Sequence, residues 1–174
     1  MTRSGSAIDE TTLKEEIRAF LQAHHVASLA TIVHGAAHAA SVMFAVDDLS
    51  LYWTSDPGTR HSLAIEGNAQ VGATVAPDYA DFRAIRGLQI AGRARRLCEA
   101  AEAAHARELL RRRFPFLLEL DRQPAALRAA LDKAAYYRLD PDSVTLIDNS
   151  KGFGNRQTLQ IGRGASSGYF SPES

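Results

Sequence analysis

The sequence predicts an α+β fold, an antiparallel split β-barrel of six or seven strands with flanking helices. Short segments in which apolar and polar residues alternate are separated by turn-forming residues, as in antiparallel hairpins. Helical periodicity is confined to the beginning of the chain, a short segment after the third expected strand and a pair of segments in the second half. Gly87 and Gly92 interrupt the longest expected strand, and such glycines indicate bulges or close backbone approach in a curved or closing barrel.

The first expected element is an amphipathic helix over residues 8–25. Its apolar residues recur at helical spacing, at Leu13, Ile17, Phe20 and Leu21. Thr11 or Thr12 precedes the acidic Glu15 and Glu16, which is a typical helix-start pattern. The segment is therefore expected to form a helix with one apolar face.

Three strands are expected next, over residues 27–33, 37–46 and 49–54. His34-Gly35 and Asp47-Asp48 separate them, and both pairs suit the tight turns of hairpins. This succession predicts an antiparallel meander.

The middle of the chain adds two further strands to the expected sheet. Pro57 and Gly58 stop the third strand, and a short helix is expected around residues 60–66. The two strands follow over residues 69–75 and 85–97. The second of them is the long strand that carries the two glycines.

A helical pair and a last hairpin complete the expected barrel. Residues 99–113 are rich in strong helix formers, and a proline separates them from a second helical segment around 116–131. Strands over 136–139 and 144–148 are expected to form the hairpin, with Asp140, Pro141 and Asp142 as its turn.

Composition and charge limit the possible functions. The 174 residues suffice for one domain, expected over residues 1–163, with a disordered tail over 164–174. Lys+Arg and Asp+Glu are balanced at 20 each, so the basic excess typical of a nucleic-acid-binding protein is absent. No segment resembles a signal peptide or a membrane span, so we expect a soluble, cytoplasmic protein without a membrane partner. Cys98 is the only cysteine, which excludes an intrachain disulfide and predicts a buried, unreactive thiol.

The segment from Trp53 to His61 carries the clearest functional signal. Hydroxyl groups, Arg60 and the N–H groups at a helix start would converge there, and these are the groups that bind phosphate. Arg60 could instead be an exposed helix residue paired with Glu66 or Asp56. Asp56 is expected to cap the helix, because its charge would repel a phosphate. Trp53 can belong to the core, to the site or to both.

The other polar clusters give weaker functional signals. His24 and His25 diverge on a helix, and no carboxylate or cysteine lies at a recognised ligand spacing beside His34 and His38, so no metal site is expected. The three arginines over 111–113 are distributed around a helix, which favours a solvated helix end over a nucleic-acid patch.

Four sequence blocks, together with the expected strands, resemble one family. The blocks are Thr59-Arg60-His61, Ile85-Arg86-Gly87-Leu88-Gln89, Arg112-Arg113-Phe114-Pro115 and Asp148-Asn149-Ser150-Lys151-Gly152-Phe153-Gly154. In this order they resemble a group of bacterial proteins of unassigned activity within the pyridoxamine 5′-phosphate oxidase-like superfamily of FMN-binding split barrels.

This resemblance implies a homodimer that holds FMN at the subunit interface. The superfamily's aromatic-Thr step falls on Trp53 and Thr54, and its Ser-Arg-Lys step falls on Thr59, Arg60 and His61. Histidine in place of lysine keeps a hydrogen-bond donor but makes the positive charge depend on pH. Phosphate binding would therefore depend mainly on Arg60.

The resemblance places the other flavin contacts on three further segments. The second strand would contribute Ser41, Val42, Met43 and Phe44. Gln89 stands apart from the Arg-Gln pair of many relatives and points to the other side of its strand from Arg86, so it is a departure from the family pattern. Lys151 lies with Phe153 in a glycine-rich turn, which is either a cover for the flavin or a flexible exit from a hairpin.

Two functions from different classes follow from this resemblance. The first is a flavoprotein oxidoreductase in which FMN carries electrons from a reduced nicotinamide, NAD(P)H, to a small-molecule substrate, with no catalytic side chain required. Pyridoxamine-phosphate oxidation itself is not expected, because the basic C-terminal pattern of that enzyme is not apparent after Asp148. The second is a non-catalytic protein that sequesters or senses a flavin or haem on the same barrel.

Overall fold

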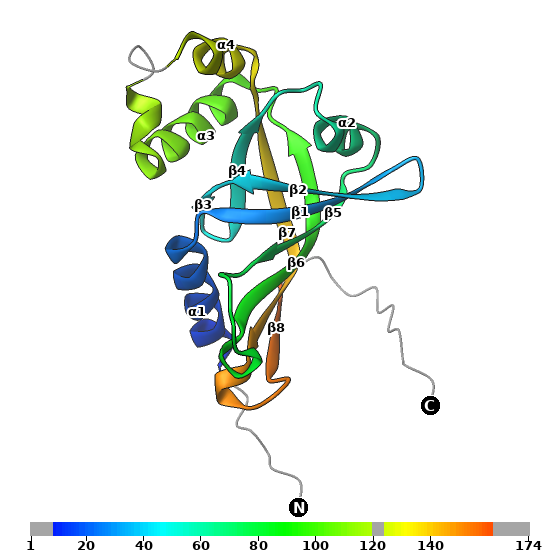
Figure 1. Ribbon diagram of the computed structural model, residues 1–174, viewed down its shortest axis with the longest axis vertical. Helices are drawn as coiled ribbons and strands as arrows, with labels where there is room; N and C mark the ends of the chain where they lie inside the picture. The colour runs from blue at the N-terminus through cyan, green and yellow to red at the C-terminus, as the bar shows by residue number, and fades with distance from the viewer. Residues whose placement is uncertain (1–8, 120–123, 162–174) are drawn as a thin grey trace, which may run out of the picture.

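The computed structural model describes residues 9–119 and 124–161, and the predicted disordered tail over 164–174 lies outside them. The predicted α+β class with an antiparallel split barrel is confirmed (Figure 1). The helices and strands are α1 (Glu10–Ala23), β1 (Val26–Val33), β2 (Ala36–Met43), β3 (Ala45–Asp47), β4 (Ser50–Ser55), α2 (Arg60–Gly67), β5 (Gln70–Val75), β6 (Arg86–Arg96), α3 (Ala100–Arg113), α4 (Ala125–Lys133), β7 (Ala135–Asp148) and β8 (Arg156–Gln160). Short 3-10 helices are η1 (Phe82–Ala84), η2 (Pro115–Leu118) and η4 (Asn149–Lys151).

The sheet has eight strands in the order β2-β1-β5-β6-β7-β4-β3, with β8 paired to β7. The strands β2 and β3 are consecutive along the chain but lie at opposite ends of this order, so the chain changes edge at Phe44 and the sheet is strongly curled (Figure 1). The single strand predicted over 37–46 is therefore two strands, and the prediction of a simple meander is wrong. The strand β8 was not predicted.

The predicted turn at His34-Gly35 is confirmed by its backbone conformation, whereas the second turn lies one residue later than predicted, at Asp48-Leu49, because Asp47 pairs with Ser50 as the last residue of β3. His34 and Gly35 have φ angles of 49° and 79°, and Asp48 has a φ of 51°. These left-handed conformations match the right-handed twist of the paired strands in tight hairpins. The turns set the register of β1 against β2 and of β3 against β4.

The predicted last hairpin is wrong, because β7 is one continuous strand of 14 residues. Its Pro141 pairs with Gly92 at a register shift in β6 between Ala91 and Gly92. A proline cannot donate to the sheet, and the register shift leaves Asp142 of β7 without a partner on β6, so Pro141 lies at a bulge in its own strand, where a proline is tolerated. The backbones approach closely there, since a Cβ on Gly92 would lie 2.4 Å from the carbonyl oxygen of Asp140. The close backbone approach expected at Gly92 is thus confirmed, and the bulge itself lies opposite it in β7.

The curled sheet encloses the main hydrophobic core. Trp53 and Tyr137 stack within it, with ring centroids 5.6 Å apart and planes 16° from parallel. The predicted apolar face of α1 is confirmed, since its four apolar residues are all buried. This core fixes the inner face of β4, on which Trp53 lies.

The helices cover different parts of the sheet. Ala106 and Leu110 of α3 are buried in two small clusters with residues of β3, β4 and β7, whereas α4 buries none of its residues. Arg113, expected at a solvated helix end, instead donates to the carbonyl oxygen of His24 at 2.6 Å, and burial lowers its pKa. It thereby satisfies a carbonyl group that follows the end of α1.

The single thiol does not lie in the core. Cys98 is exposed, so the predicted buried thiol is wrong. It follows the buried Leu97, beyond the end of β6, in the link to α3.

Candidate functional site

The end of β4 and the start of α2 form a cluster of hydrogen-bonding side chains, which we call the α2 corner (residues 55–62). Ser55 Oγ lies 2.8 Å from Nε2 of His61 and 3.3 Å from the hydroxyl of Thr59. The Thr59 oxygen also lies 2.8 Å from the buried Ser62 hydroxyl. The structure therefore brings the predicted Thr59 and His61 together with hydroxyls from both neighbouring elements.

Asp56 is not the helix cap that was predicted. Its carboxylate accepts a hydrogen bond of 2.7 Å from the backbone N–H of Gly58, because the Pro57-Gly58 step places that N–H, and not a helical one, within reach. The residue at the N-cap of α2 is Thr59, and its side chain makes no capping hydrogen bond. The first N–H groups of α2 thus have no side-chain cap and can donate to an anion.

Arg60 supplies the positive charge of the corner. It is exposed, and within residues 9–119 and 124–161 it has no ion pair. The alternative in which it pairs with Glu66 is not realised, because Glu66 lies 3.9 Å from Arg96 instead. A guanidinium at a helix start without a competing carboxylate favours an external anion as its partner.

His61 titrates below the ordinary histidine range. Its pKa is lowered first by burial, which penalises the imidazolium, and then by the charge of His38. His38 lies on β2, opposite the buried Thr31 of β1, so its side chain reaches the corner from the other hairpin. At neutral pH His61 is therefore uncharged, and an anion between the two histidines would favour its protonation.

His38 is a candidate site residue that the sequence reasoning missed. It was considered only as a metal ligand together with His34. The signal that could have found it is the hairpin register, which pairs His38 with Thr31 and places it on the inner face near α2. That placement depends on how far the sheet curls, which the sequence pattern of one hairpin does not give.

The predicted residues of β2 divide between the two faces of the strand. Val42 and Phe44 are buried in the core, so only their backbone groups could contact a ligand. Ser41 and Met43 are exposed on the outer face. Trp53 is 1% exposed inside the barrel, and its backbone alone is available there.

Gln89 lies on the same outer face as Ser41. The strand register aligns one row of small polar residues across the sheet: Ser41, Ser28, Thr74, Gln89, Thr145 and Thr158. The adjacent row consists of Ala39, Ala30, Gly72 and Ala91. Gln89 and Ser41 thus share the exposed surface of the sheet, which we call the outer face, although neither belongs to the α2 corner.

Lys151 lies in the turn at the far end of the molecule, which we call the η4 tip (residues 148–154). Figure 1 shows this orange turn at the end opposite α2. The Lys151 ammonium group is 3.2 Å from Glu16 and 3.9 Å from Asp148. Phe153 is 84% exposed and packs edge-on against Phe82. Within one protomer the structure therefore separates Lys151 from Arg60.

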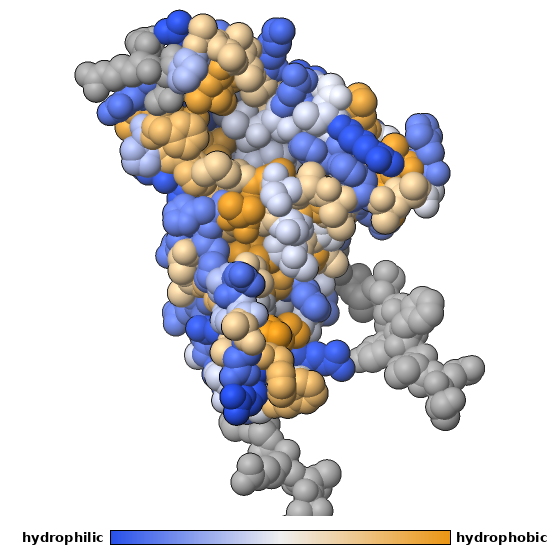
Figure 2. Space-filling model, viewed as in Figure 1, coloured by the Kyte–Doolittle hydropathy of each residue, from blue (hydrophilic) through white to orange (hydrophobic). Residues whose placement is uncertain are grey.

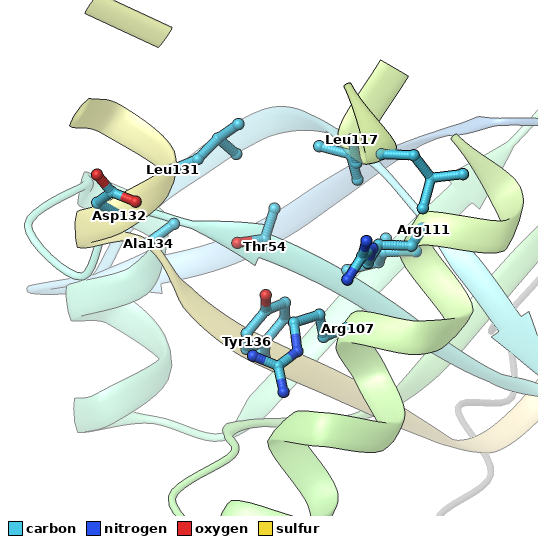
Figure 3. Close-up of a pocket in the computed structure, with 10 residues that line it drawn as sticks. Thr54, Arg107, Arg111, Leu117, Leu131, Asp132, Ala134 and Tyr136 are labelled. Carbon is cyan, nitrogen blue, oxygen red and sulfur yellow. The ribbon is translucent and has the colours of Figure 1, made fainter. Parts of the chain in front are cut away.

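Thr54, which was predicted with Trp53 as a flavin contact, points away from the α2 corner because side chains alternate along β4. Its hydroxyl donates to the carbonyl oxygen of Ala135 at 3.1 Å. Its side chain lines a cavity of about 520 Å³ between β4, β7 and the helices α3 and α4 (Figure 3). The end of β4 thus contributes to two different spaces, one on each face of the strand.

The curled sheet with its helical covers defines a split β-barrel protein. The family model for pyridoxamine 5′-phosphate oxidase matches residues 13–147, and the chain belongs to this family. UPF0306 protein YhbP of Escherichia coli O157:H7 is 30% identical over 122 residues, which cover 70% of this chain and 74% of the relative. The predicted bacterial branch without an assigned function is therefore confirmed.

Solved structures with the same fold include proteins named for two different ligands. A heme-binding protein from Mycobacterium smegmatis superposes with a TM-score of 0.66 at 19% identity, covering 84% of this chain and 57% of that chain. An FAD-binding protein from Mesorhizobium loti superposes with a TM-score of 0.57 at 22% identity, covering 75% of this chain and 90% of that chain. These similarities show a shared fold.

No helix in the described part of the chain is long and apolar enough to cross a membrane.

Proposed function

We propose that the protein binds FMN with the phosphate at the α2 corner. The observation that carries this proposal is Arg60, which has no ion pair within the described part of the chain, beside N–H groups of α2 that no side chain caps. A phosphate needs several donors at one position, and the corner supplies a guanidinium, hydroxyls and backbone groups. Asp56 opposes the anion less than an unbonded carboxylate would, because the Gly58 N–H already donates to it.

The outer face supports a homodimer that completes the site. Its rows of small and polar residues can pack closely against a second copy, and Figure 2 shows few strongly hydrophilic residues over β1 and β2. A flavin ring extending from the corner would then be enclosed between subunits. Ser41, Met43 and Gln89 lie on this face, and Lys151 would reach a flavin only from the partner subunit.

In the proposed function, bound FMN would carry electrons from a reduced nicotinamide to a small molecule in the reducing cytoplasm. The side chains of this protein would bind and orient the flavin. Arg60 would neutralise the phosphate, and the hydroxyls of Ser55 and Thr59 would fix its position. His61 would donate a hydrogen bond and take up a proton as the dianion binds.

A second candidate function is non-catalytic binding of haem on the same barrel. The neutral state of His61 at pH 7, which follows from its lowered pKa, favours it, because a neutral imidazole can ligate iron. The heme-binding structure with the same fold is consistent with this alternative. The two candidates differ in the absorption spectrum that the protein would acquire.

Titration of the purified protein with FMN and separately with hemin tests the proposal. We expect FMN to bind, and Arg60→Ala to weaken binding by about 1.5–3 kcal/mol, which is the contribution of a hydrogen bond to a charged group. Arg156→Ala is a matched control, because this exposed arginine on β8 has no ion pair among the described residues either. Equal FMN affinity in wild type and Arg60→Ala would reject the proposed position of the phosphate at the α2 corner. A Soret band that requires His61, without FMN binding, would establish the haem alternative.

A further inference from the structure

The cavity on the outer side of β4 has the size and shape of a small-molecule site. Its volume is about 520 Å³, within the usual range of roughly 300–1,000 Å³ for such sites. Figure 3 shows Arg107 and Arg111 of α3 on one side and Leu131 and Asp132 of α4 on the other, with Tyr136 and other sheet residues between them. The cavity lies on the opposite face of β4 from the α2 corner.

Two arginines give this cavity a positive side. Arg107 and Arg111 are four residues apart on α3, so they project from the same face of the helix. Neither has an ion pair within the described ranges, whereas Arg112 on the solvent side is bonded to Glu108 at 2.7 Å. Two adjacent guanidinium groups without a carboxylate repel each other, and an anion between them removes that repulsion.

The remaining lining is mainly apolar. Leu110 is buried beneath the cavity, and Leu117, Leu118 and Leu131 form part of its wall. Among the described residues, none of those in α4 is buried, so this helix forms an exposed side of the cavity. Among the described residues that line the cavity, Asp132 is the single carboxylate, so together with the two arginines they carry a net positive charge.

We propose that this cavity binds a small molecule with an apolar body and a carboxylate, sulfonate or phosphate group. The anionic group would lie between Arg107 and Arg111, and the apolar body would lie against the leucines of η2 and α4. This inference goes beyond the proposed function, since the cavity and the α2 corner lie on opposite faces of β4. Its test, however, needs no flavin.

Fluorescence titration with two probes of similar shape tests the charge requirement. Anilinonaphthalene sulfonate (ANS) is anionic, and N-phenylnaphthylamine (NPN) is neutral. We expect Arg107→Gln/Arg111→Gln to weaken ANS binding about ten-fold, the loss of one charge-assisted interaction, and to leave NPN binding unchanged. Arg112→Gln, on the same helix but outside the cavity, should change neither affinity. Unchanged ANS affinity in the double variant, or an equal loss for NPN, would overturn the proposal.

A second pair of variants tests the apolar wall. Leu131→Gln should weaken both probes, while Leu127→Gln on the same helix, which does not line the cavity, should weaken neither. An unchanged affinity for both probes in Leu131→Gln would also overturn the proposal. Arg60→Ala should leave ANS binding intact, so a failure of FMN binding would not affect this result. Loss of ANS binding in Arg60→Ala alone would assign the probe to the α2 corner and reject the cavity.

Discussion

The α2 corner and the η4 tip look alike in the sequence but differ in their charges. Both are glycine-containing turns in which a cation lies near hydroxyl groups, and both were predicted to contact a flavin. At the corner, Arg60 has no ion pair among the described residues. At the tip, Lys151 lies within 4 Å of both Glu16 and Asp148.

The difference comes from tertiary structure. Glu16 belongs to α1 and is separated from Lys151 by 135 residues along the chain. The fold packs α1 against the end of the barrel and so brings Glu16 to the tip, whereas no described carboxylate from another element pairs with Arg60 at the corner. A cation in a local motif is therefore available to an anion only where the rest of the chain supplies no carboxylate.

The largest predicted effect is a loss of stability when a buried carboxylate of the η4 tip is substituted. Asp148 is 4% exposed, accepts hydrogen bonds from the backbone N–H and hydroxyl of Ser150, and lies 3.5 Å from Arg86. We expect Asp148→Asn to lower the free energy of unfolding by about 1.5–3 kcal/mol, because it removes a nearly buried charge that accepts two hydrogen bonds and leaves Arg86 with Glu16 alone, 3.6 Å away.

Urea denaturation measures this loss, and Asp56→Asn provides the control at the corner. Asp56 is exposed and bonds only to a backbone N–H in its own turn, so its substitution should cost less than about 1 kcal/mol. Similar losses of unfolding free energy in Asp148→Asn and Asp56→Asn would contradict the difference that we infer between the two regions, in which a buried carboxylate stabilises the tip but not the corner.

The next prediction concerns pH and uses His61. In the apo protein its pKa is lowered by burial and by His38, so the folded state binds the proton less tightly than the unfolded state. Its contribution to stability is therefore complete above about pH 6.5 and is lost as the pH falls below that value. FMN affinity should change in the opposite direction, because a phosphate favours the charged imidazole.

We expect the ratio of FMN affinities of wild type and His61→Gln to rise about three- to ten-fold as the pH decreases from about 8 to 6. Protonation of the phosphate itself is common to both proteins and cancels in the ratio. His105→Gln is the control, since His105 is exposed and pairs with Asp47 on the other side of the molecule. A ratio that does not change with pH would exclude His61 from phosphate contact.

The sequence predicted most of the local structure because periodicity and turn chemistry are local signals. The face of α1, the turn at His34-Gly35 and the close backbone approach at Gly92 were all expected. The continuous strand through Pro141 was not, because only its pairing with Gly92 makes a proline tolerable there.

The candidate site was less predictable for the same reason. Thr59 and His61 are two positions apart in one sequence block, and the structure brings their side chains together. His38 and the carboxylates at Lys151 depend on long-range packing, which no single block contains. Gln89 and Ser41 share the outer face through the register of four strands, and their contact with a flavin stays a prediction.

The smallest effect is expected for Lys151→Ala. Its side chain is 40% exposed, and exposed ion pairs contribute less than about 1 kcal/mol, so the free energy of unfolding should change little. To bind a partner's flavin phosphate, Lys151 would have to leave Glu16 and Asp148, so we expect FMN affinity to change less than about two-fold. FMN titrations of Lys151→Ala and Glu16→Gln distinguish a Lys151 that stays paired with Glu16 and Asp148 from one that binds the partner's flavin. If Lys151 does contact the flavin, the first variant should bind FMN as poorly as Arg60→Ala, while the second should bind it more tightly than wild type, because it releases the lysine.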